Sequence, residues 1–164
     1  TELGREAVRR MQRLNILPDV SHTSDRSFWD ILKLAEGPVV AYHSDCRALS
    51  DVRRNLTDEQ LRAIRDTGGV IGVNVYHGFV HAEPRMQTAA MLARHAAHIA
   101  ETIGPEHVAC GFDFCEYFGP GNEGCEGMES CAQTGNFFFE LERLGFSAAE
   151  RQGIASENLL RVLE

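Results

Sequence analysis

The chain has 164 residues, 43% of them hydrophobic and 24% charged, which is ordinary for a globular domain with a real core. Its net charge of −8 argues against nucleic acid or an anionic membrane surface as a partner. No run approaches the roughly 18 apolar residues of a membrane-spanning helix, so no span is predicted.

The first residues, Thr1 to Glu6, are charged and have helical spacing, which is not typical of a signal peptide. We therefore expect the chain to begin inside a helix. Its five cysteines have irregular spacing and form no Cys-x-x-Cys pair, which fits a reducing compartment and predicts a cytoplasmic location. Cys125 and Cys131 share a glycine-rich loop, where pairing or metal binding is an alternative to two free thiols.

Short apolar runs alternate with stretches of helical periodicity along the chain. We expect four strands, at about residues 17–22, 39–43, 70–76 and 108–114. We expect helices before and between them, over residues 2–14, 27–35, 57–66 and 87–103. The third of these helices starts at a capping box formed by Thr57 and Gln60. Strands that alternate with helices predict an α/β fold with parallel strands.

The end of the chain is expected to hold a long loop followed by two helices. The loop covers residues 119–135, and its glycines and its length are typical of functional loops. The closing helices cover residues 136–164, and Ser147 with Glu150 forms a second capping box that begins the last of them. We treat residues 1–164 as part of one domain.

Three of the four expected strands end in a side chain that could ligate a metal: His22, His43 and Asp113. Reactive groups of parallel α/β folds lie at the carboxyl ends of the strands, and two imidazoles with a carboxylate suit zinc. Taken singly, a histidine after a strand is more often a hydrogen-bonded structural residue. Two other histidine pairs are candidates by their spacing, His77 with His81 and His95 with His98, and for the second pair packing or capping is the expected role.

Several ordered blocks resemble motifs of the membrane (renal) dipeptidase family of zinc metallopeptidases. The strongest are Asp19-Val20-Ser21-His22, His43-Ser44-Asp45-Cys46-Arg47-Ala48-Leu49 and Arg54-Asn55-Leu56-Thr57-Asp58-Glu59-Gln60-Leu61. Weaker matches lie at residues 68–74, 95–99 and 158–162, so the resemblance spans nearly the whole chain. It implies the C-terminal half of a (β/α)8 TIM-type barrel, a fold of about 250 residues when complete.

The resemblance also implies zinc-dependent hydrolysis of dipeptides that have a free carboxyl terminus. In it, His22 and His43 hold one metal of a bridged pair of zinc ions, while Asp113 binds the other and acts on the hydrolytic water. Arg54 receives the substrate carboxylate, which suits a guanidinium fork, and Tyr76 lines the substrate pocket. The alternatives are a surface salt bridge for Arg54 and a core position for Tyr76.

The chain departs from the family pattern in two ways. Cys115 stands where the family has a second aspartate after Asp113, and the His-x-Asp pair and bridging glutamate of the family have no counterpart. We therefore expect residues 1–164 to carry part of the active site, to be inactive alone, and to associate with a second copy or with a missing N-terminal half. A non-catalytic half-barrel binding domain, and an amidohydrolase-like barrel acting on another small amide, stay open as alternatives.

Overall fold

The computed structural model describes residues 1–164 and contains a short parallel sheet. Strand β1 (Ile71–Val73) pairs in parallel with β2 (Val108–Cys110), with Ile71 opposite Val108. Two earlier segments extend the sheet through single parallel bridges, from Asp19 to Val40 and from Ala41 to Ile71. Four parallel segments thus lie side by side in chain order, and the predicted α/β fold with parallel strands is confirmed.

The expected strands at residues 17–22, 39–43, 70–76 and 108–114 were too long. Regular pairing covers three residues in each of β1 and β2, and the first two segments make only isolated bridges. The reason is that side-chain oxygens replace backbone carbonyls as acceptors near the strand ends. Asp19 Oδ1 accepts from the Tyr42 N–H at 3.1 Å, and Ser21 Oγ accepts from the His43 N–H at 3.2 Å. The residues that build the site therefore interrupt the ladder.

Helices account for most of the regular structure. They are α1 (Glu2–Arg13), α2 (Asp25–Leu32), α3 (Asp58–Asp66), α4 (His77–Val80), α5 (Ala89–Ile103), α6 (Thr134–Arg143), α7 (Ala148–Gln152) and α8 (Asn158–Leu163). Helix α3 begins at the predicted capping box, because Thr57 Oγ1 accepts from the Gln60 N–H and Gln60 Oε1 accepts from the Thr57 N–H. None of the helices combines the length and apolar character that a membrane crossing requires.

The closing region differs from the two helices expected over residues 136–164. A capping box of Ser130 and Gln133 starts a 3-10 turn at Cys131–Gln133 that runs directly into α6, so helical structure begins earlier. After the predicted capping box at Ser147, α7 continues through a π-helical turn, Gly153–Glu157, into α8. The expected loop at 119–135 is consequently shorter.

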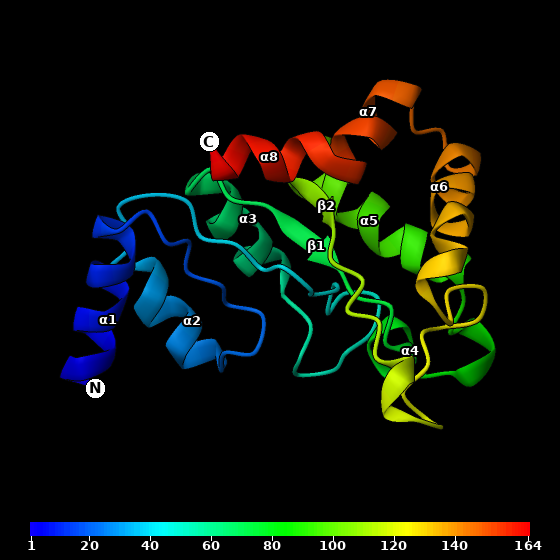
Figure 1. Cartoon of the computed structure of the whole chain (residues 1–164), viewed down its shortest axis with the longest axis horizontal. Helices are drawn as coiled ribbons and strands as arrows, with labels where there is room; N and C mark the ends of the chain where they lie inside the picture. The colour runs from blue at the N-terminus through cyan, green and yellow to red at the C-terminus, as the bar shows by residue number, and fades with distance from the viewer.

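The helices surround the sheet unevenly. Helix α5 packs against β1, β2, α3 and α6, while the π-helical turn and α8 pack beside β2. Figure 1 shows α1 and α2 at one end of the molecule, α6 at the other, and α7 and α8 running along one side between them. The main apolar core joins the strands to α5 and α6, and its fully buried members include Ile71, Val73, Leu92, Ile99 and Phe137.

Two glycines allow the strand segments to approach closely next to the site. A Cβ atom at Gly111 would lie 1.6 Å from the Tyr42 carbonyl oxygen, and one at Gly72 would lie 2.1 Å from the same atom. Both are far inside van der Waals contact, so no larger residue fits without a backbone shift. The absence of these side chains brings the segment that carries His43 against the segment that leads to Asp113.

The buried ring of Phe137 gives a direct test of this core. The ring has no exposed area and packs against Phe112, with centroids 5.2 Å apart. Phe137→Ala should lower the free energy of unfolding by about 3–5 kcal/mol, because it removes a large side chain and leaves a cavity. Phe139→Ala is the matched control on α6, since that ring is 59% exposed and its loss should change stability by about 0.5 kcal/mol or less. Equal urea-unfolding midpoints for the two variants would contradict this core assignment.

Candidate functional site

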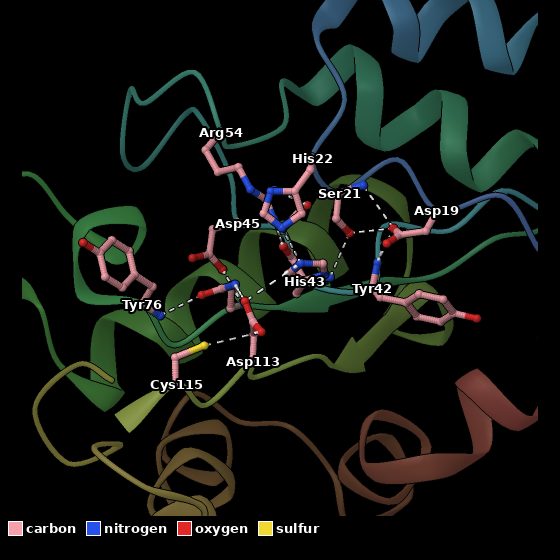
Figure 2. A network of polar contacts seen from close by, with 12 residues as sticks. Asp19, Ser21, His22, Tyr42, His43, Asp45, Arg54, Tyr76, Asp113 and Cys115 are labelled. Atoms are coloured by element: carbon pink, nitrogen blue, oxygen red, sulfur yellow. Dashed lines mark hydrogen bonds and ion pairs between the residues drawn. The ribbon is translucent and has the colours of Figure 1, made fainter. Parts of the chain in front are cut away.

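The three predicted ligands meet at the carboxyl ends of the parallel segments. The Nε2 atoms of His22 and His43 lie 2.9 Å apart, and His43 Nε2 lies 3.9 Å from Asp113 Oδ2. Figure 2 shows both imidazoles and the Asp113 carboxylate directed toward one another. In the neutral histidine pair one ring donates a hydrogen bond to the other. Three segments far apart in the sequence therefore bring two imidazoles and a carboxylate to one place.

Short side chains on the first segment fix the two histidines. Asp19 Oδ1 accepts hydrogen bonds from the Ser21 N–H at 3.0 Å and from the Ser21 hydroxyl at 2.6 Å. The same oxygen accepts from the Tyr42 N–H, while Ser21 Oγ accepts from the His43 N–H. Asp19 and Ser21 thus link the residue before His22 to the backbone of His43. Their role is to position the two histidines and not to take part in a reaction.

Asp113 is held in an unusual backbone conformation. Its φ is +57°, in the left-handed region that non-glycine residues seldom occupy. The Asn74 amide donates to Asp113 Oδ2 at 3.2 Å, and Cys115 Sγ lies 3.8 Å from Oδ1. Burial raises the pKa of the Cys115 thiol, and the Asp113 carboxylate raises it further, so the thiol stays protonated at neutral pH. The cysteine at this position therefore serves as a weak donor to Asp113.

The electrostatics of His43 favour the neutral ring. Burial lowers its pKa, and the nearby Arg54 guanidinium lowers it too, although the Asp113 carboxylate acts in the opposite direction. Neutral imidazole is the form that binds a metal ion, since a protonated ring has no free lone pair. The surroundings of His43 thus suit a ligand at neutral pH.

Arg54 is anchored directly behind His43. Its Nη2 donates to the His43 carbonyl at 2.7 Å and its Nη1 donates to Ser44 Oγ at 3.0 Å. The guanidinium carbon lies 5.4 Å from the centre of the Phe79 ring, which is within the range of a cation–π contact. The second N–H on each of these two nitrogens is not engaged here and can donate to a carboxylate. The surface salt bridge that was the alternative for Arg54 is absent.

Asp45 is a site residue that the sequence patterns did not single out. It has no exposed area, and burial raises its pKa, although the hydrogen bond from the Asn74 N–H and the charge of Arg54 oppose the shift. Its Oδ1 accepts from the Asn74 N–H at 3.1 Å, whereas its Oδ2 and the Nε of Arg54 are both buried without a hydrogen-bond partner. The one sequence feature that could have indicated a role for Asp45 is its place two positions after the predicted ligand His43. Asp45 ties the His43 segment to the end of β1.

Tyr76 lies across a pocket from the histidines. Its side chain is 37% exposed, so the alternative of a core position is wrong, and its N–H donates to Asn74 Oδ1 at 2.7 Å. The pocket has a volume of about 310 Å³, and its lining includes His22, Asp113 and Cys115 together with the aromatic rings of Tyr76, Phe79 and Phe118. A larger cavity of about 490 Å³ lies at the opposite ends of the strand segments, and neither histidine nor cysteine lines it.

The alternative histidine and cysteine groups have structural roles. The Cys46 N–H donates to His95 Nδ1, which leaves His95 Nε2 to donate to the Val80 carbonyl, so both nitrogens of this buried ring have hydrogen-bond partners. His98 contacts Asp58 at 2.7 Å across α5 and α3. All five cysteines are free, so the considered bond between Cys125 and Cys131 is not formed. His77 stacks on Tyr76, and His81 accepts from the Glu83 N–H.

The donor set of the site fits part of a metal centre. Two nitrogens bound to one tetrahedral zinc at about 2.0–2.1 Å stand about 3.3 Å apart, so the 2.9 Å pair of His22 and His43 needs to open only slightly. No group of three or more histidine, cysteine or acidic side chains of this chain is placed to hold an ion without such adjustment. Residues 1–164 therefore offer two imidazoles and a nearby carboxylate, not a closed site.

Comparison with known proteins gives consistent results. Residues 1–164 match the model of the family described as membrane dipeptidase, peptidase family M19. An uncharacterised Klebsiella pneumoniae protein from the pqqA 5' region is 42% identical over 117 residues, which cover 70% of this chain and 43% of that protein. An uncharacterised dipeptidase of Schizosaccharomyces pombe is 32% identical over 164 residues, covering 97% of this chain and 38% of its own length.

A solved structure shares the fold. The metallo peptidase from Rhodobacter sphaeroides, liganded with a phosphinate mimic of the dipeptide L-Ala-D-Ala, superposes with a TM-score of 0.89 at 30% sequence identity. The alignment covers 99% of this chain and 46% of that one. The chain thus spans less than half the length of each of these three proteins.

Proposed function

This chain belongs to the membrane dipeptidase family, and we propose that the protein containing it is a zinc-dependent dipeptidase that carries part of its active site on residues 1–164. One observation supports this function above others. The side chains of His22, His43 and Asp113 converge at one edge of the sheet, with the guanidinium of Arg54 held behind His43. Imidazole and carboxylate groups suit a hydrolytic metal, and an anchored arginine suits the free carboxylate that distinguishes a dipeptide from an internal peptide segment.

Each residue has a distinct role in this proposal. His22 and His43 hold the metal, and Asp113 holds a second ion and takes the proton of the attacking water. When bound, the two zinc ions polarise the scissile carbonyl and make that water more acidic. Asn74 orients the Asp113 carboxylate through the 3.2 Å hydrogen bond. Arg54 binds the substrate carboxylate with its remaining N–H groups, and Tyr76 closes the far wall of the pocket.

We further propose that residues 1–164 form the C-terminal half of a (β/α)8 barrel. Four parallel segments in chain order, each followed by helical structure, support this arrangement. The segment at Asp19 and strand β2 are the two edges of the sheet, and open edges favour pairing with further strands. The remaining strands and ligands then come from an N-terminal half, or from a second copy of this chain.

The test is an assay of the full-length protein with unblocked dipeptides. We expect free amino acids to be released from a substrate such as L-Ala-L-Ala, and the reaction to stop after dialysis against a chelator. Added Zn²⁺ should restore it, because the proposed chemistry needs the metal for every turnover. Release that persists after the metal content has fallen below one-tenth of an equivalent would refute the metal-dependent mechanism.

Two alternatives make different predictions in the same assay. A non-catalytic half-barrel binding domain would bind dipeptides without hydrolysing them, and the Cys115 substitution is the feature that favours it. An amidohydrolase-like barrel acting on another small amide would hydrolyse substrates that lack a free carboxylate. The anchoring of Arg54 to the backbone of His43 favours the dipeptidase over both alternatives, since it directs a half-buried positive charge to the site.

A further inference from the structure

The pocket beside the candidate site has an aromatic wall, formed by Tyr76, Phe79 and Phe118. The proposed catalytic steps do not use this wall. Tyr76 and Phe79 meet edge to face, with ring centroids 4.8 Å apart, and Phe118 faces the same space from the turn at Glu116–Phe118. Phe118 is 69% exposed, which is high for a large apolar ring. Exposed aromatic surface that lines a pocket is typical of a binding site for an apolar group.

The position of Phe79 decides which part of a dipeptide reaches this wall. Its ring lies under the Arg54 guanidinium, at 5.4 Å, and it also lines the pocket. A substrate carboxylate held by Arg54 therefore places the residue that bears it, the carboxyl-terminal residue, next to Phe79. His22 and Asp113 line the same pocket, so the scissile amide, which precedes the carboxyl-terminal residue, is within reach of the proposed metal ligands.

The charges around the pocket further restrict the kind of substrate side chain that it can bind. Its lining contains the carboxylates of Asp113 and Glu123 and no lysine or arginine. An acidic side chain would meet these two like charges, at a cost that grows as the substrate excludes water, while the nearby Arg54 guanidinium is already occupied by the terminal carboxylate of the substrate. An apolar ring meets Val75, Tyr76, Phe79 and Phe118 instead. With a volume of about 310 Å³, the pocket is at the small end of ligand sites and suits one side chain.

We propose that Tyr76, Phe79 and Phe118 form a specificity subsite for the side chain of the carboxyl-terminal residue, and that it selects bulky apolar residues over small or acidic ones. This proposal rests on the proposed dipeptidase function and adds the class of substrate. Phe118 is the specificity-determining residue, because it is the most exposed of the three and belongs to a turn that carries none of the proposed metal ligands.

The experiment compares three substrates, L-Ala-L-Phe, L-Ala-L-Ala and L-Ala-L-Asp, in the full-length, metal-loaded protein and two variants. The unaltered protein should show the highest kcat/KM with L-Ala-L-Phe and the lowest with L-Ala-L-Asp. Phe118→Ala should reduce the ratio of kcat/KM for L-Ala-L-Phe to that for L-Ala-L-Ala by about tenfold. Phe139→Ala is the matched control, since this ring on α6 is 59% exposed and does not line the pocket, and the ratio should stay unchanged.

The outcomes separate this proposal from the function on which it rests. Hydrolysis of all three dipeptides with no preference, or an unaltered ratio in Phe118→Ala, overturns the subsite and leaves the dipeptidase function standing. Hydrolysis of none of them overturns both. An equal fall of kcat/KM for L-Ala-L-Phe and L-Ala-L-Ala in Phe118→Ala also overturns the subsite, because it indicates a general effect of the turn on the site.

Discussion

The His43→Ala variant is expected to lose bound metal and activity together. His43 contributes one of the two imidazoles, and its Nε2 lies between His22 and Asp113 at 2.9 and 3.9 Å. Removing it leaves a single nitrogen ligand on this chain, which is too few for stable zinc binding. Because the metal supplies several kcal/mol of transition-state stabilisation, kcat should fall on the order of 10³-fold or more.

The fold should survive this change. The hydrogen bonds that His43 makes to Ser21 and Arg54 use its backbone N–H and carbonyl, which alanine keeps. Thermal unfolding of the metal-free forms should therefore be similar for the variant and the unaltered protein. His81→Ala is the control, since that ring lies away from the pocket and accepts only from the Glu83 N–H. Zinc content measured by mass spectrometry decides the question, and full occupancy in His43→Ala would remove His43 from the site.

Arg54→Ala is expected to weaken the binding of dipeptides by about 10²-fold or more. A bidentate contact between a half-buried guanidinium and a carboxylate is worth about 2–4 kcal/mol, and each 1.4 kcal/mol corresponds to a factor of ten. The loss should appear mainly in KM, because the carboxylate is bound equally in the ground state and the transition state. A smaller decrease in kcat would reflect looser placement of the scissile amide.

Two controls make this measurement specific. Arg53→Ala removes the same side chain one position earlier, where it is exposed and makes no hydrogen bond, and KM should not change. A dipeptide with an amidated carboxyl terminus lacks the charge that Arg54 binds, so the variant and the unaltered protein should handle it about equally poorly. An unchanged KM for the unblocked dipeptide in Arg54→Ala would show that another group holds the carboxylate.

Local sequence signals predicted much of this fold because their physical causes are local. The capping boxes at Thr57 and Ser147 each satisfy backbone N–H groups within one helical turn, so four neighbouring residues suffice to recognise them. The length of the strands was predicted less well. The acceptors that end the ladder, Asp19 and Ser21, belong to a different segment from the N–H groups they bind, and spacing along one strand does not reveal such partners.

The candidate site likewise contains residues that local sequence signals predict and residues that they do not. His22, His43 and Asp113 could be predicted because each follows an apolar run, and parallel strands place such residues at one edge. Asp45 could not, since its burial and its hydrogen bond to Asn74 arise only when the His43 segment lies beside β1. Phe118 was also missed, because a ring in a short turn has no periodicity that relates it to Tyr76 and Phe79.

The sequence by itself determined the alternation of helices and parallel strands, the helix starts and the identity of the three side chains that converge. Each of these follows from the chemistry of residues that are neighbours in the chain. Only the tertiary structure decided how the groups are supported. It placed Tyr42 over Gly72 and Gly111 and oriented Arg54 against the His43 carbonyl. These are contacts between segments separated by a helix or more, and their geometry depends on the packing of the whole core rather than on any one stretch of sequence.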